Sequence, residues 1–140
     1  MICLKTPNFL FGSFYSSLKN AILKKTSIFT TYLCKLTMLV SYFFLKKRYF
    51  SNVELYQLLI NKKNRTFLYI TINYNEDENA FFDVCLLYSK TYTKYISLVQ
   101  LKRLSKVERT IYILSTSRGI FNTSEAIIYN IGGIPLLEIF

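Results

Sequence analysis

The sequence predicts an α+β protein, and three observations lead to this class. Apolar side chains recur at helical spacing across residues 11–25, strand-like alternation runs through residues 65–74, and three of the four glycines gather near the C-terminus. At 140 residues the chain is long enough for one core-bearing domain or for two small lobes.

The first half is predicted to contain two helices with a short strand between them. Residues 11–25 place apolar side chains at three- and four-residue steps and lysines on the other side, as in an amphipathic helix with a basic face. The β-branched and aromatic stretch SIFTTYL (27–33) is typical of a strand. Helical spacing returns over residues 36–44, and the basic run at 46–48 suits the C-terminal end of that helix dipole. A polar link is expected at 61–64.

The second half is predicted to be mostly strands. RTFLYITINY (65–74) and FFDVCLLY (81–88) are expected to pair as a long hairpin, with the acidic segment NEDEN as its turn. TKYISLV (93–99) and TIYILST (110–116) are expected to be further strands, joined by the basic connector QLKRLSKVER.

The C-terminal stretch from Ser115 is predicted to form a tight turn, a short helix and a final strand. Asn122, with Glu125 three residues later, resembles a capping box that opens the helix SEAIIYN. Gly132 is expected to end that helix in the left-handed conformation, and Gly133 to let the chain turn into the strand IPLLEIF.

The charge balance indicates a polyanionic partner. Eighteen Lys and Arg face eight Asp and Glu, a formal net charge of +10, and no acidic residue precedes Glu54. Nucleic acid is the first candidate partner and an anionic membrane surface the second. The alternative is a cationic surface that binds no specific partner. The acid-free N-terminus is poor in arginine, so we expect it to belong to the mature protein.

The residue inventory argues against catalysis. The absence of histidine removes Ser-His, Cys-His and His-ligated metal chemistry, and the three cysteines are too widely spaced for the usual zinc sites. No cofactor is indicated, and we expect the protein not to be an enzyme. A minimal hydrolase that uses Ser115 or Ser117 with a lysine base is the catalytic alternative.

Residues 26–45 raise a membrane alternative. These twenty positions carry one charge, Lys35, and match the length of a bilayer-spanning helix. A small organelle-encoded, membrane-embedded subunit is therefore the alternative function. The abundance of Phe, Tyr, Ile, Asn and Lys and the scarcity of Ala, Pro and Trp suggest an A/T-rich genome. Such genomes are typical of organelles, and we expect a mitochondrial protein, with the plastid as the alternative.

The segment STSRGIFNTSEAIIYNIGG (115–133) resembles the C-terminal signature of the bacterial-type family of small-subunit ribosomal protein eight. That signature reads Ser-Thr-Ser, a basic residue, Gly, an apolar pair, then Thr, Glu-Ala and Gly-Gly. SSLKNAI (16–22) and YSKTYTKYIS (88–97) agree more weakly. The chain departs from the pattern in three places: Ile134-Pro135 where the family usually has Glu, Thr91-Tyr92 in place of Pro-Gly, and Ile127-Ile128 in place of basic residues.

The resemblance implies a protein of two small lobes. Residues 1–88 would form an N-terminal α-β-α-β-β lobe, and residues 89–140 a mostly β lobe with a short helix. The resemblance also implies a structural, non-catalytic protein that binds the central domain of small-subunit rRNA directly, contacts neighbouring ribosomal proteins, supports subunit assembly and is not inserted in a membrane.

The resemblance also implies roles for individual residues. The main RNA contact would be made by Ser115, Thr116, Ser117, Arg118 and Gly119. Glu125, Gly132 and Gly133 would hold that loop in shape. Lys19 and Asn20 would touch a second part of the same RNA, and Lys90 and Lys94 are weaker candidates for phosphate contacts.

Overall fold

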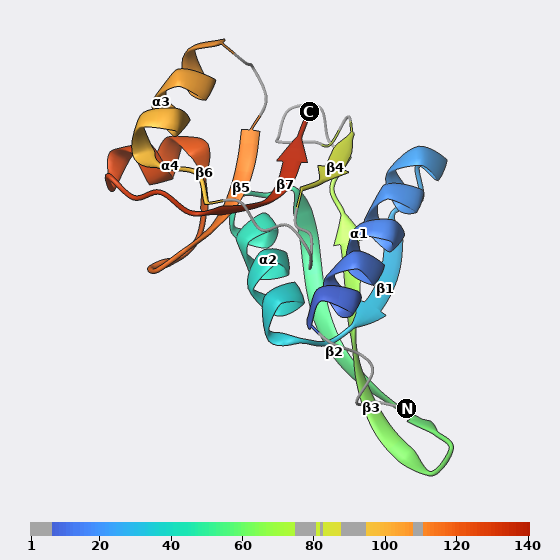
Figure 1. Ribbon diagram of the computed structural model, residues 1–140. Coiled ribbons are helices and arrows are strands. Elements are labelled where there is room, and N and C mark those ends of the chain that lie inside the picture. The colour runs from blue at the N-terminus through green and yellow to red at the C-terminus, as the bar shows by residue number, and fades with distance from the viewer. Residues whose placement is uncertain (1–6, 75–80, 82, 88–94, 108–110) are drawn as a thin grey trace. The chain divides into compact units, whose positions relative to one another are not determined.

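The computed structural model describes residues 7–74, 81, 83–87, 95–107 and 111–140 (Figure 1). The chain divides into two compact units, Met1–Phe81 and Phe82–Phe140. Both combine helices with antiparallel sheet, so the predicted α+β class is confirmed. The expected boundary between the two lobes, after residue 88, lies among residues that the structure does not describe. It therefore stays a prediction.

The first unit contains two helices and a three-stranded sheet. Its elements follow the predicted α-β-α-β-β order and are α1 Pro7–Lys24, β1 Ile28–Tyr32, α2 Lys35–Lys46, β2 Phe50–Ile60 and β3 Lys63–Ile72. The strand order is β1-β3-β2, with both pairings antiparallel, so β3 is the central strand.

A reciprocal pair of hydrogen bonds starts α2. The Thr37 backbone N–H donates to Cys34 Sγ over 3.4 Å, and the Cys34 backbone N–H donates to Thr37 Oγ1 over 2.9 Å. Two backbone donors that the first helical turn leaves unpaired are thereby satisfied. Cys34, one of the widely spaced cysteines of the sequence, therefore has a structural role as a helix cap.

The core of the first unit is largely aromatic. Helices α1 and α2 lie against the same face of the sheet (Figure 1). The fully buried Phe44 has its ring centroid 5.2 Å from that of Phe50 and 5.1 Å from that of Phe81, both at steep interplanar angles. Edge-to-face packing of this kind adds to the hydrophobic gain of burying the rings. Leu68 and Ile70 of β3 complete this core.

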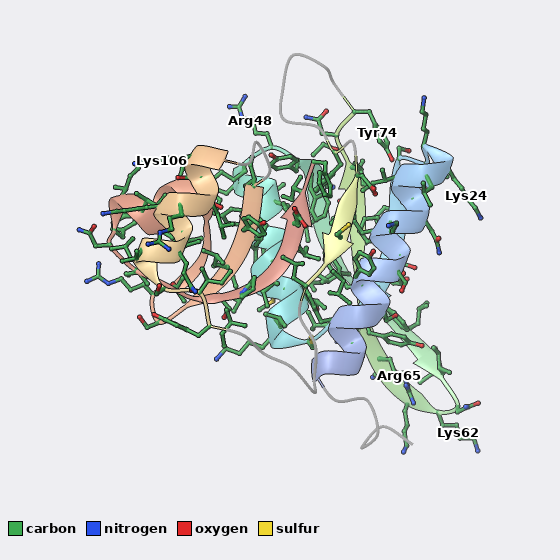
Figure 2. The ribbon with its side chains drawn as sticks, turned by 45° about the horizontal axis from the view of Figure 1, so that its top comes forward. Lys24, Arg48, Lys62, Arg65, Tyr74 and Lys106 are labelled. Atoms are coloured by element: carbon green, nitrogen blue, oxygen red, sulfur yellow. The ribbon has the colours of Figure 1, made fainter. Side chains whose placement is uncertain are left out.

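A tyrosine closes the end of α1. The Tyr74 hydroxyl lies 3.1 Å from the Ala21 carbonyl oxygen and 2.7 Å from that of Thr26, so its proton is shared between two acceptors (Figure 2). Burial raises the pKa of Tyr74 above its ordinary value, so this hydroxyl keeps its proton at neutral pH. The contact joins the last turn of α1 to the chain beyond β3.

The expected pairing of 65–74 with 81–88 is wrong. β3 pairs instead with β2 through a turn at Asn61-Lys62, whose φ angles are 51° and 62°. Positive φ at both turn residues is the geometry that suits a two-residue hairpin. The polar link expected at 61–64 is this turn and the start of β3. The NEDEN segment lies outside the described residues.

The second unit is a four-stranded sheet with two helices. Its elements are β4 Val84–Leu86, α3 Leu98–Val107, β5 Ile111–Thr116, β6 Gly119–Asn122, α4 Thr123–Ile128 and β7 Ile134–Ile139. The strand order is β4-β7-β5-β6, again antiparallel. Leu101 of α3, Leu114 of β5 and Ala126 of α4 are fully buried together, so both helices share one core with the sheet.

Two predictions between residues 93 and 109 are wrong. In the described part of 93–99, only Ile96 makes a bridge, to Gly133, and a helix begins at Leu98. The expected basic connector is α3 itself. The Ser97 backbone N–H donates to Gln100 Oε1 over 3.1 Å and the Gln100 N–H to Ser97 Oγ over 3.4 Å, a capping box that the sequence S-L-V-Q already contained.

The segment proposed as a membrane span holds two separate elements. Residues 26–45 include all of β1 and most of α2. Among the described residues, no helix has the length and the apolar character needed to cross a membrane. The membrane-embedded alternative is therefore not favoured.

The aromatic core can be tested by truncating Phe44. We expect Phe44→Ala to lower the free energy of unfolding by about 3–5 kcal/mol, because the ring is fully buried among other rings. Leu39→Ala, on the exposed side of the same helix, should change it by no more than about 0.5 kcal/mol. Urea titration followed by circular dichroism measures both, and equal losses would contradict this description of the core.

Candidate nucleic-acid interface

The predicted RNA-binding loop is the turn of the β5–β6 hairpin. Thr116 at the end of β5 pairs with Gly119 at the start of β6, so Ser117 and Arg118 are the two turn residues. Gly119 has a φ of 120°, in the region that side chains disfavour. The loop therefore depends on the glycine at this position.

One of the three hydroxyl groups in this loop is used to close the turn. Thr116 Oγ1 donates to the Gly119 carbonyl over 2.8 Å and accepts from the Arg118 backbone N–H over 3.2 Å. These bonds replace the backbone pairing that the turn interrupts. Thr116, which the family resemblance assigned to direct contact, is thus in the first place a residue that shapes the loop.

The remaining polar groups of the loop face outward. Ser117 and Arg118 are exposed, and Ser115 is half-buried at the end of β5. Among the described residues, no carboxylate forms an ion pair with the Arg118 guanidinium. The tip thus offers hydroxyl groups that can donate or accept and a cation with five donors.

Gly133 allows β7 to lie close to β5 beside this loop. A Cβ atom at Gly133 would lie 2.7 Å from the Ser115 carbonyl oxygen and 2.9 Å from Thr116 Cγ2. Ser115 pairs with Ile134 in the β5–β7 ladder, so this close approach is where β7 begins. Any side chain at position 133 would push the two strands apart.

The expected role of Gly132 is wrong in one respect. Its φ is not positive, and Asn130, with a φ of 55°, is the left-handed residue that ends α4. The Ile131 N–H donates to the Ala126 carbonyl over 2.9 Å and the Asn130 N–H to Ile127 over 3.2 Å, the paired bonds of a Schellman stop. Because asparagine tolerates the left-handed conformation, α4 does not need Gly132 to end it.

Gly132 instead allows close packing. A Cβ atom on Gly132 would overlap the Ile96 carbonyl oxygen and lie 2.8 Å from the Tyr95 hydroxyl. The next residue, Gly133, exchanges two backbone hydrogen bonds with Ile96, of 2.8 and 3.1 Å. The glycine pair therefore brings the residues before α3 against the start of β7.

The short helix α4 follows the loop strand directly. The Glu125 backbone N–H donates to the Asn122 side chain over 2.8 Å, which confirms Asn122 as the N-cap. Thr123 Oγ1 bonds to the backbone of Tyr112, at 3.0 Å from its N and 3.4 Å from its O, and so ties the helix to β5. The role of the Glu125 carboxylate in holding the loop stays a prediction.

The remaining predicted contacts lie elsewhere in the chain. Lys19 and Asn20 are on α1 in the first unit, where Lys19 Nζ lies 5.8 Å from the centroid of the Tyr15 ring. Asn20 is exposed. Lys90 and Lys94 fall outside the described residues. The structure brings the 115–119 loop together with Gly133, and all of the proposed RNA contacts stay predictions.

A further basic surface, not expected from the sequence, lies on α3. Helix α3 buries Leu101 and exposes Lys102, Arg103 and Lys106, the last of which points into solvent in Figure 2. Leucines at positions 98, 101 and 104 follow a three-residue spacing that indicates a helix, and the S-L-V-Q cap supports it. Cations on this exposed side are suited to phosphate oxygens.

These features are typical of a structural RNA-binding protein: a basic α+β chain that presents hydroxyl groups and a cation at the tip of a hairpin. Residues 11–140 match the family model of ribosomal protein S8, and the chain therefore belongs to that family. A search among individual curated proteins finds no match. Proteins of this family are structural components of the small ribosomal subunit that bind small-subunit rRNA and other ribosomal proteins and are not enzymes.

The close approach at Gly133 can be tested against a second glycine. We expect Gly133→Ala to lower the free energy of unfolding by about 1–3 kcal/mol and to weaken RNA binding, because the new methyl group displaces β7 from β5. Gly12 lies in α1, where a Cβ meets nothing within 4 Å. Gly12→Ala should therefore raise the free energy of unfolding by about 0.5–1 kcal/mol. Thermal unfolding and filter binding measure the two effects. A tolerated Gly133→Ala would argue against the packing role.

Proposed function

We propose that this chain binds the central domain of small-subunit rRNA directly and supports folding of that domain during assembly of a mitochondrial small subunit. Family membership supports the general role in the ribosome. The arrangement of the β5–β6 turn supports the direct contact, because Thr116 closes the turn and leaves Ser117 and Arg118 exposed at its tip.

The chemistry of the loop suits an A-form helix. The minor groove of double-stranded RNA is wide and shallow and displays 2′-hydroxyl groups and base edges. Ser115 and Ser117 can donate to or accept from these groups, and Gly119 adds no side chain that would hold the backbone away. In this arrangement the exposed Arg118 would bind a phosphate of the same groove.

Long-range charge supplies the part of the affinity that does not depend on sequence. The net charge of +10 attracts the RNA, and contacts between lysine or arginine and phosphate release counterions. The exposed cations of α3 are the strongest additional candidates in the second unit, and Lys19 with Asn20 remain candidates in the first. Binding should therefore weaken steadily as salt rises.

The compartment is inferred from composition alone. The enrichment in residues with A/T-rich codons favours an organellar gene, and we place the protein in the mitochondrion with the plastid as the alternative. The excess of apolar side chains fits the same codon bias.

Arg118 carries the sharpest test of RNA contact. We expect Arg118→Ala to weaken binding to a central-domain rRNA fragment by about tenfold, because a charge-assisted hydrogen bond is lost. The slope of log affinity against log salt should fall by about one contact. Lys63→Ala removes the same charge from the hairpin of the first unit and should leave affinity for this fragment nearly unchanged. Identical salt slopes for Arg118→Ala and the native chain would contradict the assigned role.

The compartment can be tested by co-sedimentation. We expect the endogenous protein to co-sediment in sucrose gradients with mitochondrial small-subunit rRNA, and to leave that fraction when magnesium is chelated and the subunit dissociates. Plastid fractions from the same cells are the matched control where plastids exist. Recovery with plastid rRNA instead would move the proposal to that organelle.

A further inference from the structure

The outer edge of β2 is the longest unpaired strand edge in the described part of the chain. The strand order β1-β3-β2 leaves β2 at one side of its sheet, with eleven residues, while β1 at the other side has five. Among the described residues, no strand pairs with β2 on the side away from β3. Edge strands of this length are templates for another strand.

The hairpin turn determines which backbone groups point outward. Because Ile60 and Lys63 close a two-residue turn, they form a hydrogen-bonded pair, and such pairs alternate along an antiparallel ladder. Leu58 therefore bonds toward β3 as well. The N–H and C=O groups of Leu55, Gln57 and Leu59 point away from the sheet. They form a regular row of donors and acceptors at strand spacing.

The end of this hairpin is also unusually apolar. Leu55 is 52% exposed, Leu58 45%, Leu59 71% and Ile60 38%. The hairpin extends beyond the ends of α1 and α2, so the helices do not cover these side chains (Figure 1). Because neighbouring residues of a strand point to opposite faces, both faces of the hairpin carry exposed aliphatic groups. Exposed apolar side chains gathered at one end of a hairpin mark an interaction site.

The usual protection of an exposed edge is missing from this part of β2. Between Val53 and Ile60 there is no lysine and no proline, and Glu54 is the one charge. The bulge of the strand lies at its other end, between Phe50 and Asn52. Lysine, proline and bulges are the devices that prevent strand addition, so this edge is open to it.

We propose that the outer edge of β2 binds an extended segment of a neighbouring small-subunit ribosomal protein, which adds a fourth strand to the sheet. The segment would carry apolar side chains for Leu55 and Leu59 and an acidic side chain near Lys62 and Lys63. Lys62 lies at the end of the hairpin (Figure 2), and Lys63 is the first residue of β3 after the turn. The inference rests on membership of a ribosomal protein family and not on the RNA loop.

The chemistry of this edge favours protein over RNA. Single-stranded RNA is bound by aromatic rings that stack on its bases and by cations along its backbone. On this part of β2 the aromatic ring of Tyr56 is half-buried and packs against Phe67 of β3. The outer row of β2 offers the aliphatic groups of Leu55 and Leu59 and evenly spaced amides instead, and the cations of the hairpin, Lys62, Lys63 and Arg65, lie at the turn and in the first residues of β3. A peptide strand complements all three features, since it supplies amides, apolar side chains and a carboxylate.

Photocrosslinking in assembled small subunits tests the proposal. A photoreactive phenylalanine analogue replaces Leu55 in the full-length chain, subunits are purified and irradiated, and the adduct is identified by mass spectrometry. We expect an adduct with a ribosomal protein, at a segment of alternating apolar residues. The yield is counted per incorporated chain, so that weaker rRNA binding, as in Arg118→Ala, does not lower it.

A matched pair of substitutions separates strand addition from mere proximity. Gln57→Pro removes one outward N–H and no bond to β3, and should reduce the adduct by about tenfold, because the added strand loses a partner. Gln57→Ala keeps that N–H and should leave the yield within about twofold. If Gln57→Pro fails to fold, Leu59→Lys decides the matter. Leu59 is the most exposed of the four aliphatic residues at the end of the hairpin. Its replacement by lysine should therefore cause the same loss of adduct.

Four outcomes would overturn the proposal. These are an adduct with RNA, an adduct with a second copy of this chain, no protein adduct in assembled subunits, and equal yields from Gln57→Pro and Gln57→Ala. None of them affects the rRNA-binding proposal, which depends on Arg118 in the other unit.

Discussion

The candidate RNA interface depends on one steric constraint, the contact between β7 and β5 at Gly133. The backbone of Ser115 occupies the space that a side chain would need, so β7 can pair with β5 only if position 133 carries none. That pairing supports β5 from the side opposite β6, and the turn at Ser117-Arg118 projects from a strand held on both sides. A site on a supported hairpin is more precisely placed than one on an isolated loop.

Short-range signals in the sequence predicted the local structure well. Asn122 and Glu125 marked the start of α4, and the two early helices followed from their periodicity. Residue types alone do not show which hydroxyl group of the loop closes the turn and which faces solvent. Thr116 and Ser117 have similar side chains, and only the geometry of the turn shows that the first closes the loop and the second faces solvent.

Strand pairing was less predictable for a physical reason. β2 has apolar residues on both faces near its end, so it lacks the alternation that identifies a half-buried strand. From the sequence, the next apolar run, which supplies β4, therefore looks like the partner of β3, although β4 pairs with β7. The lysines and arginine of α3 suggest a solvated connector, and they obscure the helical spacing of Leu101 and Leu104. What decides the structure of α3 is burial against distant parts of the chain, since Leu101 is buried together with Leu114 and Ala126.

The two proposed surfaces, the β5–β6 loop and the outer edge of β2, differ in the chemistry by which each would recognise a partner. Attraction of a +10 chain to RNA acts over a Debye length and is not directional, so it favours every exposed cation. Along the outer half of β2 there is no cation until the turn at Lys62, and the surface there is aliphatic. RNA gains little by covering such an edge, whereas a peptide strand satisfies its amides and buries its leucines. The loop of the second unit has the opposite character, with hydroxyl groups and a guanidinium and little apolar surface to bury. The two proposals thus assign RNA binding and protein binding to two hairpins of different composition.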